Sequence, residues 1–246
     1  MSIADQVIKA FAPTGELRAS INVGNPVLAS KDAKTGQPIG VSIDLAQAFA
    51  DRLGVALELV VFDTAAKSVD ALGQGQADIG FFAIDPMRGK EIAFTAPYIL
   101  IEGSYMVRGD SPLVSNDDVD RAGQRVAVGK GSAYDLYLTR ELKQAQIVRA
   151  PSAPAVIDLF LEQQLEVAAG VRQMLVADAQ RFPNLRLLPG RFMVIRQALA
   201  TPKARGEAAV VVLSQFVEQM KSCGFVDDAL ARHGIKGAVV EPAESH

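Results

Sequence analysis

The chain alternates strand-like and helix-like segments, and it does so twice. In the first hundred residues, short apolar runs alternate with segments of helical spacing, in the order strand-helix-strand-helix-strand. A Gly-Asp-Ser-Pro stretch at 109–112 marks a boundary, and residues 125–188 then repeat the alternation through four strands and three helices. Strands joined through helices pair in parallel, so each half is expected to form a mostly parallel sheet flanked by helices. The sequence therefore predicts an α/β protein with two similar lobes and a ligand cleft between them.

The expected elements follow from periodicity and from turn residues. Alternating or wholly apolar runs predict strands at residues 17–23, 55–62, 77–82, 104–108, 125–128, 147–148, 165–171, 185–188 and 192–201. Helical spacing predicts helices at residues 4–11, 43–53, 68–72, 133–142, 156–163, 173–180, 203–221 and 225–233. Ser42 is expected to cap the helix that begins at residue 43, and residues 237–246 are expected to lack regular structure.

The composition excludes several classes of protein. Hydrophobic residues make up 49% of the chain, which is enough to build two cores. The net charge is -3, so no basic surplus points to nucleic acid, and no stretch reaches the ~20 continuous apolar residues of a membrane span. One cysteine and two histidines allow no internal disulfide and no transition-metal cluster, so we expect no metal and no cofactor. Cys223 is expected to serve packing at a helix end.

Common catalytic motifs are missing from the sequence. Residues 129–132 (Gly-Lys-Gly-Ser) lack the spacing of a P-loop, and the glycines at 73–75 precede a strand, unlike a dinucleotide fingerprint. There is no Gly-x-Ser-x-Gly, and with His233 in the last helix a Ser-His-Asp triad would need a coincidence. We therefore predict no catalytic residue and look for a binding site.

Arg88 is the first candidate for binding. It lies on a loop after the apolar run 77–82, at the C-terminal end of a predicted strand, where open α/β sheets bind ligands. Its planar guanidinium could hold a carboxylate through two parallel hydrogen bonds. Alternatively, Arg88 is a solvated loop residue or pairs with Asp85 or Glu91.

Ser132 is the second candidate. It follows Gly131 at the predicted start of a helix, and backbone N–H groups at such a position favour an anion. Ser132 could equally cap its own helix, and one serine can do both.

Four segments of the chain carry a family resemblance. They are Gly-Val-Ser-Ile-Asp-Leu-Ala with Ala-Asp-Arg-Leu-Gly (40–46 and 50–54), Ala-Leu-Gly-Gln-Gly-Gln-Ala-Asp (71–78), Ile-Asp-Pro-Met-Arg with Ile-Ala-Phe-Thr-Ala-Pro-Tyr (84–88 and 92–98), and Val-Ala-Val-Gly-Lys-Gly-Ser (126–132). Together and in this order they resemble the bacterial extracellular solute-binding proteins of family 3, which serve polar amino-acid ABC transporters. The match covers residues 15–234.

This resemblance implies a two-lobed type II periplasmic binding fold. Lobe 1 would be discontinuous and comprise residues 1–102 and 202–246, and lobe 2 would comprise residues 103–201. The chain would cross between the lobes near residues 99–104 and 196–202, and the lobes would close on a ligand by a hinge.

The resemblance also assigns roles to individual residues. Arg88 stands where the family holds the α-carboxylate of its ligand, and Ser132 stands where a second-lobe serine helps. The Asp that usually holds the ligand ammonium is replaced by Val171, with Arg172 beside it. Neighbouring positions expected to line the ligand are Phe81, Ala83, Ala133 and Asn25.

The chain departs from the family at the other end of the ligand. Residues 25–28 contain no aromatic where the family has Tyr-x-x-Phe, and Thr64-Ala65 stand where a Trp or Tyr usually walls the ligand. An ammonium facing Val171 would lack a counter-charge, and a buried charge without its partner typically costs about 3–5 kcal/mol. These departures favour a carboxylate-bearing molecule without an ammonium group.

Three functions remain open from the sequence. The first is a monomeric, non-enzymatic binding protein that delivers a small amino acid-like or organic carboxylate to an ABC transporter permease. The second is a dehydratase-like enzyme on the same scaffold, with Asp85, Glu102 and Glu162 as candidate acids. The third is a cytosolic ligand sensor, because the N-terminal Met-Ser-Ile-Ala-Asp-Gln does not read as a signal peptide. The protein would be periplasmic if a leader was removed, and cytoplasmic otherwise.

Overall fold

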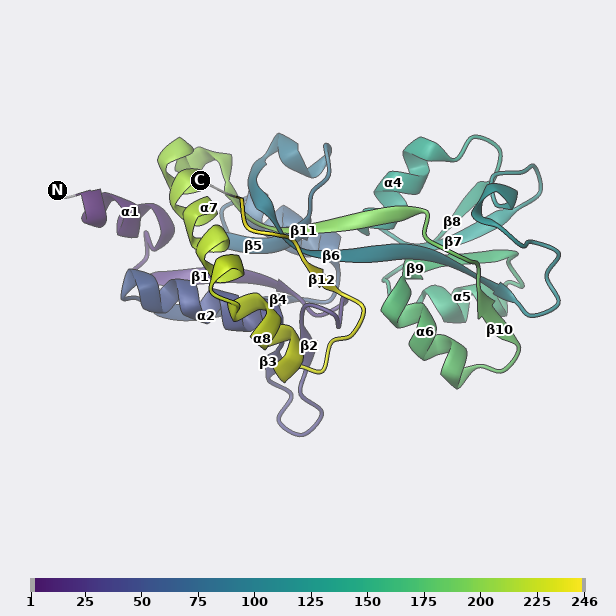
Figure 1. Ribbon diagram of the computed structural model, residues 1–246. Coiled ribbons are helices and arrows are strands. Elements are labelled where there is room, and N and C mark those ends of the chain that lie inside the picture. The colour runs from purple at the N-terminus through teal and green to yellow at the C-terminus, as the bar shows by residue number, and fades with distance from the viewer. Residues whose placement is uncertain (1–2, 245–246) are drawn as a thin grey trace. The chain divides into compact units, whose positions relative to one another are not determined.

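The computed structural model of the protein describes residues 3–244 and divides into two compact units (Figure 1). Unit 1 comprises Met1–Leu100 and Arg196–His246, and unit 2 comprises Ile101–Ile195. Two strands, β6 (Ile92–Arg108) and β11 (Met193–Pro202), carry the chain from one unit to the other. The Gly-Asp-Ser-Pro stretch at 109–112 lies inside unit 2, so the expectation that it marks a boundary is wrong.

Unit 1 is built on a parallel sheet. Its strands lie in the order β4 (Ala56–Phe62), β1 (Glu16–Asn22) and β5 (Ile79–Ala83), and β11 runs antiparallel beside β5. All five residues of β5 are buried, as its nearly apolar sequence requires. The predicted strand-helix alternation of the first hundred residues is confirmed.

Helices surround the sheet of unit 1. The aromatic rings of Phe11, Phe49 and Phe216 join three of these helices in the core, with ring centroids 4.9 and 4.8 Å apart. The helices are α1 (Ile3–Phe11), α2 (Val41–Leu53), α3 (Ala65–Gly73), α7 (Glu207–Ser222) and α8 (Phe225–Arg232). The remaining short elements are β2 (Ser30–Lys31), β3 (Pro38–Ile39) and the 3-10 turns η1 (Arg88–Lys90) and η3 (Lys203–Arg205).

Unit 2 repeats this architecture. Its strands lie in the order β6, β9 (Val167–Val171), β7 (Arg125–Gly129) and β8 (Gln146–Ala150), with β7, β8 and β9 parallel and β10 (Leu185–Leu187) paired to β6. Its helices are α4 (Ala133–Glu141), α5 (Val156–Glu162) and α6 (Arg172–Arg181), and η2 (Asn116–Asp118) is a 3-10 turn. Phe160 of α5 and Leu175 of α6 pack with Met106 and Ala168 on one face of the sheet.

The same arginine–carboxylate clasp occurs in both units. In unit 1, the backbone N and side-chain Nε of Arg18 donate to Oδ2 of Asp78, each at 3.0 Å, and Nη2 donates to Oδ1 at 2.9 Å. In unit 2, Arg125 binds Glu166 through the same three groups, at 2.9, 2.9 and 2.8 Å. Each clasp joins one strand (β1 or β7) to the residue just before its parallel neighbour (β5 or β9).

The turn that leads into each clasp explains why one unit uses Asp and the other Glu. The clasping arginines also bind the carbonyl of a residue with left-handed backbone, Gly75 (φ 73) and Gln164 (φ 49). Asp78 lies three positions after Gly75, but Glu166 lies only two positions after Gln164. We infer that the extra methylene of Glu makes up for the shorter turn.

Several predicted element ends are wrong. Helix α2 begins at Val41 after Gly40, and Ser42 makes no capping hydrogen bond. Gly40 has φ 133, and a Cβ there would lie 2.5 Å from the Leu28 carbonyl oxygen, so the close approach of the chain decides where the helix begins. Helix α7 starts only at Glu207, because η3 and the positive φ of Gly206 precede it.

Two residues of the C-terminal segment form a strand where irregular structure was expected, and residues 245–246 lie outside the described part of the chain. Val239 and Val240 form β12 and pair antiparallel with Leu100 and Ile99 of β6. The buried ammonium of Lys221 secures the segment by donating to the carbonyls of Pro97 and Pro242, both at 3.3 Å. Cys223 is exposed, so its expected packing role is also wrong.

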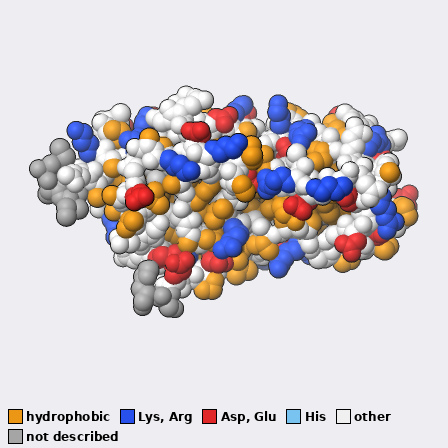
Figure 2. Space-filling view, turned by 90° about the horizontal axis from the view of Figure 1, so that it is seen from above, with side chains coloured by type: hydrophobic (Ala, Val, Ile, Leu, Met, Phe, Trp, Pro, Cys, Tyr) orange, Lys and Arg blue, Asp and Glu red, His pale blue; other side chains and the backbone are white. Residues whose placement is uncertain are grey.

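The surface combines charged and apolar side chains. Lys and Arg side chains are interspersed with Asp and Glu and with hydrophobic side chains on the face shown in Figure 2. Among the described residues, no helix is long and apolar enough to cross a membrane. Over the same part of the chain, His, Cys, Asp and Glu side chains form no group of three that could hold a metal ion.

The two clasps give a stability prediction. Asp78 is fully buried and also binds Arg205, whereas the side chain of Glu166 is 33% exposed. Asp78→Asn should lower the free energy of unfolding by about 3–5 kcal/mol, because it leaves two guanidinium groups without their carboxylate. Glu166→Gln, the matched change in unit 2, should cost about 1 kcal/mol or less because solvent screens that pair. Chemical denaturation measures both, and equal losses would contradict the assignment.

Candidate functional site

Arg88 lies at the C-terminal end of β5 in unit 1. Only 8% of its surface is exposed, and Nη1 donates to the carbonyl of Ala83 at 3.1 Å. The loop between them is held by Asp85, whose Oδ1 accepts the backbone N–H of Met87 at 2.8 Å. The guanidinium is therefore placed by the strand end itself, which makes its position rigid.

The electrostatic setting of Arg88 is that of a desolvated cation. Burial lowers the pKa of Arg88 to about 10, and the nearby carboxylate of Asp85 partly opposes this shift. Arg88 is thus charged at neutral pH, although the solvation of that charge is reduced. The alternative that Arg88 is a solvated loop residue is wrong, because the side chain is buried.

Three other predicted site residues belong to unit 1. Phe81 and Ala83 are alternate residues of β5, and both are buried, at 5% and 3% exposure. Asn25 follows β1, and its Oδ1 accepts the N–H of Val27 at 3.3 Å, which shapes the turn there. Since β1 and β5 are neighbouring parallel strands, Asn25 after β1 and Ala83 at the end of β5 lie toward the same edge of the sheet.

Ser132 holds the corresponding place in unit 2, after β7. Its Oγ accepts the N–H of Asp135 at 3.0 Å, so Ser132 is the N-cap of α4, and Ala133 is the first residue of that helix. The cap uses Oγ as an acceptor, and the hydroxyl also forms a hydrogen bond with the side chain of Tyr134. Burial raises the pKa of the adjacent Tyr134 to about 12, with hydrogen bonds from Ser132 and Gly129 opposing the shift.

Asp135 and Arg149 support Ser132, and the sequence analysis missed both. The Asp135 carboxylate accepts the N–H of Gly131 at 2.8 Å and binds Nε of Arg149 at 3.0 Å. The Ser-x-x-Asp spacing is a readable capping signal. Arg149 gives no such signal, because it lies on β8 and contacts Asp135 only in the folded protein.

Val171 is the last residue of β9, the strand beside β7, and Arg172 is the next residue. Val171 is buried, while Arg172 opens α6 and donates through Nη1 to the carbonyl of Gly190 at 3.0 Å and to Oγ of Ser104 at 3.4 Å. Nε of Arg172 also lies 3.8 Å from Glu102. These contacts tie α6 to β6 and to the loop at Gly190, which is a structural role.

The three candidate acids have different surroundings within their units. Asp85 belongs to unit 1, and Glu102 lies on β6 in unit 2, where Arg191 binds it at 2.8 Å. Glu162 is exposed at the last position of α5. Helix α5 returns the chain from β8 to the start of β9, so Glu162 lies toward the edge of the sheet opposite to Ser132.

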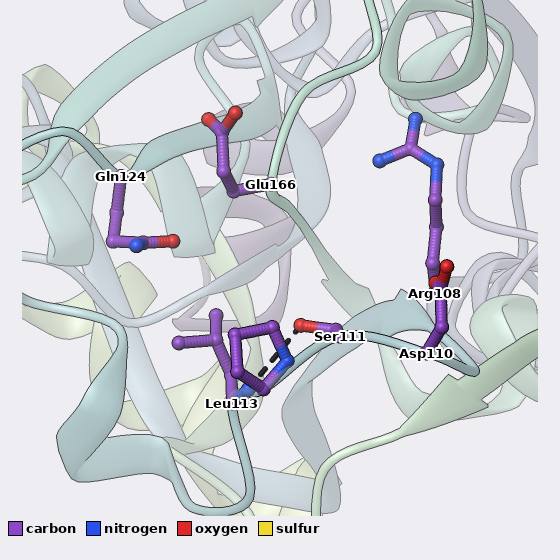
Figure 3. A pocket seen from close by; sticks show the side chains of 7 residues that line it. Arg108, Asp110, Ser111, Leu113, Gln124 and Glu166 are labelled. Carbon is purple, nitrogen blue, oxygen red and sulfur yellow. Dashed lines mark hydrogen bonds between the residues drawn. The ribbon is translucent and has the colours of Figure 1, made fainter.

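A pocket of about 290 Å³ lies within unit 2, at the N-terminal ends of β7 and β9 (Figure 3). Two of its three charged side chains are already engaged. Arg108 donates to the Leu165 carbonyl at 2.7 Å and stacks over the Phe160 ring at 4.7 Å, and Glu166 belongs to the clasp with Arg125. The lining residues are Arg108, Asp110, Ser111, Pro112, Leu113, Gln124 and Glu166. The pocket contains none of the predicted site residues.

The chain belongs to the bacterial extracellular solute-binding proteins, family 3, whose family model matches residues 17–234. The predicted resemblance is thereby confirmed. The Glutamine-binding protein of Geobacillus stearothermophilus is 23% identical over 195 residues, which cover 78% of this chain and 74% of that protein.

Solved structures agree on the fold. The amino acid ABC transporter substrate-binding protein AbpA from Streptococcus pneumoniae, bound to L-arginine, has a TM-score of 0.78 and 21% identity, and covers 92% of this chain and 97% of its own. An ancestral amino acid-binding protein, a precursor of cyclohexadienyl dehydratase, has a TM-score of 0.75 and 25% identity, with coverages of 94% and 99%. The predicted type II periplasmic binding fold is confirmed.

Ser132 allows its two roles to be separated. Ser132→Ala should cost about 1 kcal/mol of unfolding free energy through the lost cap, whereas Ser132→Gly should cost only a few tenths. If the hydroxyl also binds the ligand, both variants should lose affinity to the same extent. Denaturation and ligand titration measure the two effects. Affinity losses that follow the stability losses would leave capping as the whole role of Ser132.

Proposed function

We propose that this protein is the solute-binding component of an ABC-type uptake system and binds a small carboxylate-containing solute in a cleft between its lobes. Its family and its relatives support this role, since they include amino acid ABC transporter substrate-binding proteins. The observation that carries the proposal is the buried guanidinium of Arg88 at the ligand-binding edge of a parallel sheet. Hinge closure near residues 99–104 and 196–202 would then enclose the solute.

Arg88 is the proposed anchor for the carboxylate. A cation that has lost most of its hydration gains strongly from an anion that arrives with suitable geometry, and two parallel N–H···O bonds suit a carboxylate. The backbone bond to Ala83 fixes the guanidinium before the ligand arrives. Little side-chain entropy is then lost on binding.

Ser132 is the proposed second contact for the same carboxylate. The first N–H groups of α4 are donors, and the dipole of the helix favours a negative charge at this end. The bonds from Asp135 hold the loop at Gly131 in the shape that the ligand would meet. Ala133, Phe81, Ala83 and Asn25 are the proposed surrounding residues.

The other end of the solute is proposed to carry no ammonium group. Relatives are named for glutamine or are bound to arginine, but here Val171 ends the strand where an acid would be needed. An ammonium buried against Val171 without a counter-charge would cost about 3–5 kcal/mol. A small organic acid avoids this cost.

The proposed partner is the permease of an ABC transporter, which the loaded protein would meet outside the cytoplasm as a monomer.

An enzymatic alternative arises from the 25% identity to a precursor of cyclohexadienyl dehydratase. We expect no turnover of prephenate-like acids, because Glu102 is bound by Arg191 and Glu162 is at the far edge of its sheet. Product formation that disappears in Asp85→Asn would favour the enzyme.

Arg88→Gln should abolish ligand binding. Native mass spectrometry of freshly purified protein should show a bound acid on the wild type and on Arg52→Gln, an exposed arginine of the same unit, but none on Arg88→Gln. Adding the identified acid at about 100 times its Kd should stabilise the two binding-competent proteins by about 2.7 kcal/mol. The same stabilisation in Arg88→Gln would show that Arg88 is not the anchor.

A further inference from the structure

Unit 2 presents an aromatic and apolar surface beside Ser132. Val171 ends β9 and lies directly opposite Gly103 of β6, while Ala169 lies opposite Tyr105. Residues opposite one another in paired strands point to the same face, and so do residues two apart. Val171, Gly103 and Tyr105 therefore share one face of the sheet, opposite to the face that packs against α5 and α6.

Phe192 covers the glycine on that face. Its backbone N–H donates to the carbonyl of Gly103 at 3.0 Å, which aligns the two residues side by side. A Cβ at position 103 would lie 2.9 Å from Cζ of Phe192 and 2.6 Å from Cγ of Met193. Glycine is thus required at this position so that the Phe192 ring can lie over the strand.

The Phe192 ring stacks with two tyrosine rings, Tyr105 on β6 and Tyr137 on α4. The ring centroids of Phe192 and Tyr105 are 4.3 Å apart, and those of Phe192 and Tyr137 are 6.1 Å apart, with nearly parallel planes in both pairs. Tyr105 is buried, but Phe192 and Tyr137 are partly exposed. Ser132 follows β7 and Val171 ends its parallel neighbour β9, so the N-terminal end of α4 and Val171 lie at the same edge of the sheet.

The carboxylates near this surface are already engaged. Asp135 binds Arg149 and also accepts from Gly131 and Thr139. Glu102 binds Arg191 at 2.8 Å and has Arg172 at 3.8 Å. Asp120, whose charge acts on Tyr105, accepts the backbone N–H groups of residues 143–145. An incoming ammonium would have to compete with these donors, whereas an apolar group would meet Val171 and the partly exposed Phe192 ring.

We propose that the solute is a monocarboxylic acid whose other end is an uncharged aromatic or bulky apolar group, and that Val171 and Phe192 determine this specificity. This inference rests on the proposed function and names the class of solute for the same site. The carboxylate would lie at Arg88 and Ser132, and the apolar group would contact Val171 and Phe192. Aromatic groups are favoured over alkyl groups because an offset-stacked ring can extend the existing stack.

Matched compounds test the inference by isothermal titration calorimetry on the full chain. L-Phenylalanine and 3-phenylpropionate differ only in the ammonium group, and L-glutamine and L-arginine represent the ligands of relatives. 3-Phenylpropionate should bind at least about tenfold more tightly than L-phenylalanine, because the ammonium finds no counter-charge. Equal or tighter binding of any of the three amino acids would overturn the inference.

Substitutions at the two residues complete the test. Val171→Asp should reverse the preference between 3-phenylpropionate and L-phenylalanine, and Val171→Leu, the apolar control, should keep it. Should Val171→Asp fail to fold, Phe192→Leu serves instead. It should weaken 3-phenylpropionate by about tenfold but leave butyrate unchanged. An unchanged affinity for 3-phenylpropionate in Phe192→Leu would overturn the role of the ring.

The outcomes separate this inference from the proposed function. If another class of acid binds and its binding depends on Arg88, the aromatic specificity is wrong and the solute-binding function stands. If neither the amino acids nor the acids bind, and native mass spectrometry detects no bound solute, both are wrong.

Discussion

Both units contain an arginine–carboxylate clasp across neighbouring parallel strands. Arg18 and Asp78 form it in unit 1, where both the carboxylate and the unit's stability depend on it most, and Arg125 and Glu166 form it in unit 2, with the same three donor groups. Because the backbone and the side chain of one arginine bind one carboxylate, the strand of the arginine and the turn before its parallel neighbour are held in a single register. The clasps lie where the strands begin. The opposite edge, where the strands end, can therefore carry loops that serve recognition rather than stability.

That opposite edge shows how each unit holds a polar group in place. Arg88 is held by the carbonyl of the strand end at Ala83, and Ser132 by the carboxylate and backbone of Asp135. Burial of Arg88 is unfavourable for the folded protein alone, as its lowered pKa indicates. Each unit thus has a clasp at one edge and, at the other, the residue that we propose to bind the anion.

Local sequence patterns predicted much of this arrangement. The alternation of strand and helix patterns, the strand end before Arg88 and the helix start at Ser132 all depend on residues close together in the chain. The failures share a non-local cause. Helix α2 begins after Gly40 because the chain there passes close to Leu28. Residues 239–240 form a strand because they pair with β6. Glu162 was a candidate acid only until the direction of α5 placed it at the far edge of its sheet.

The sequence by itself determined the two α/β units, the family and the position of one arginine after a buried strand, because periodicity and short motifs encode local structure. Only the tertiary structure decided what surrounds those residues. It buried Arg88 beside Asp85, joined Arg149 to the Ser132 loop, and assigned Arg172 to Glu102, Ser104 and Gly190. It also placed Phe192 on Gly103, 89 positions apart in the sequence, where only the register of β6 brings them together. Contacts of this kind depend on strand order and register, and a single sequence does not display them.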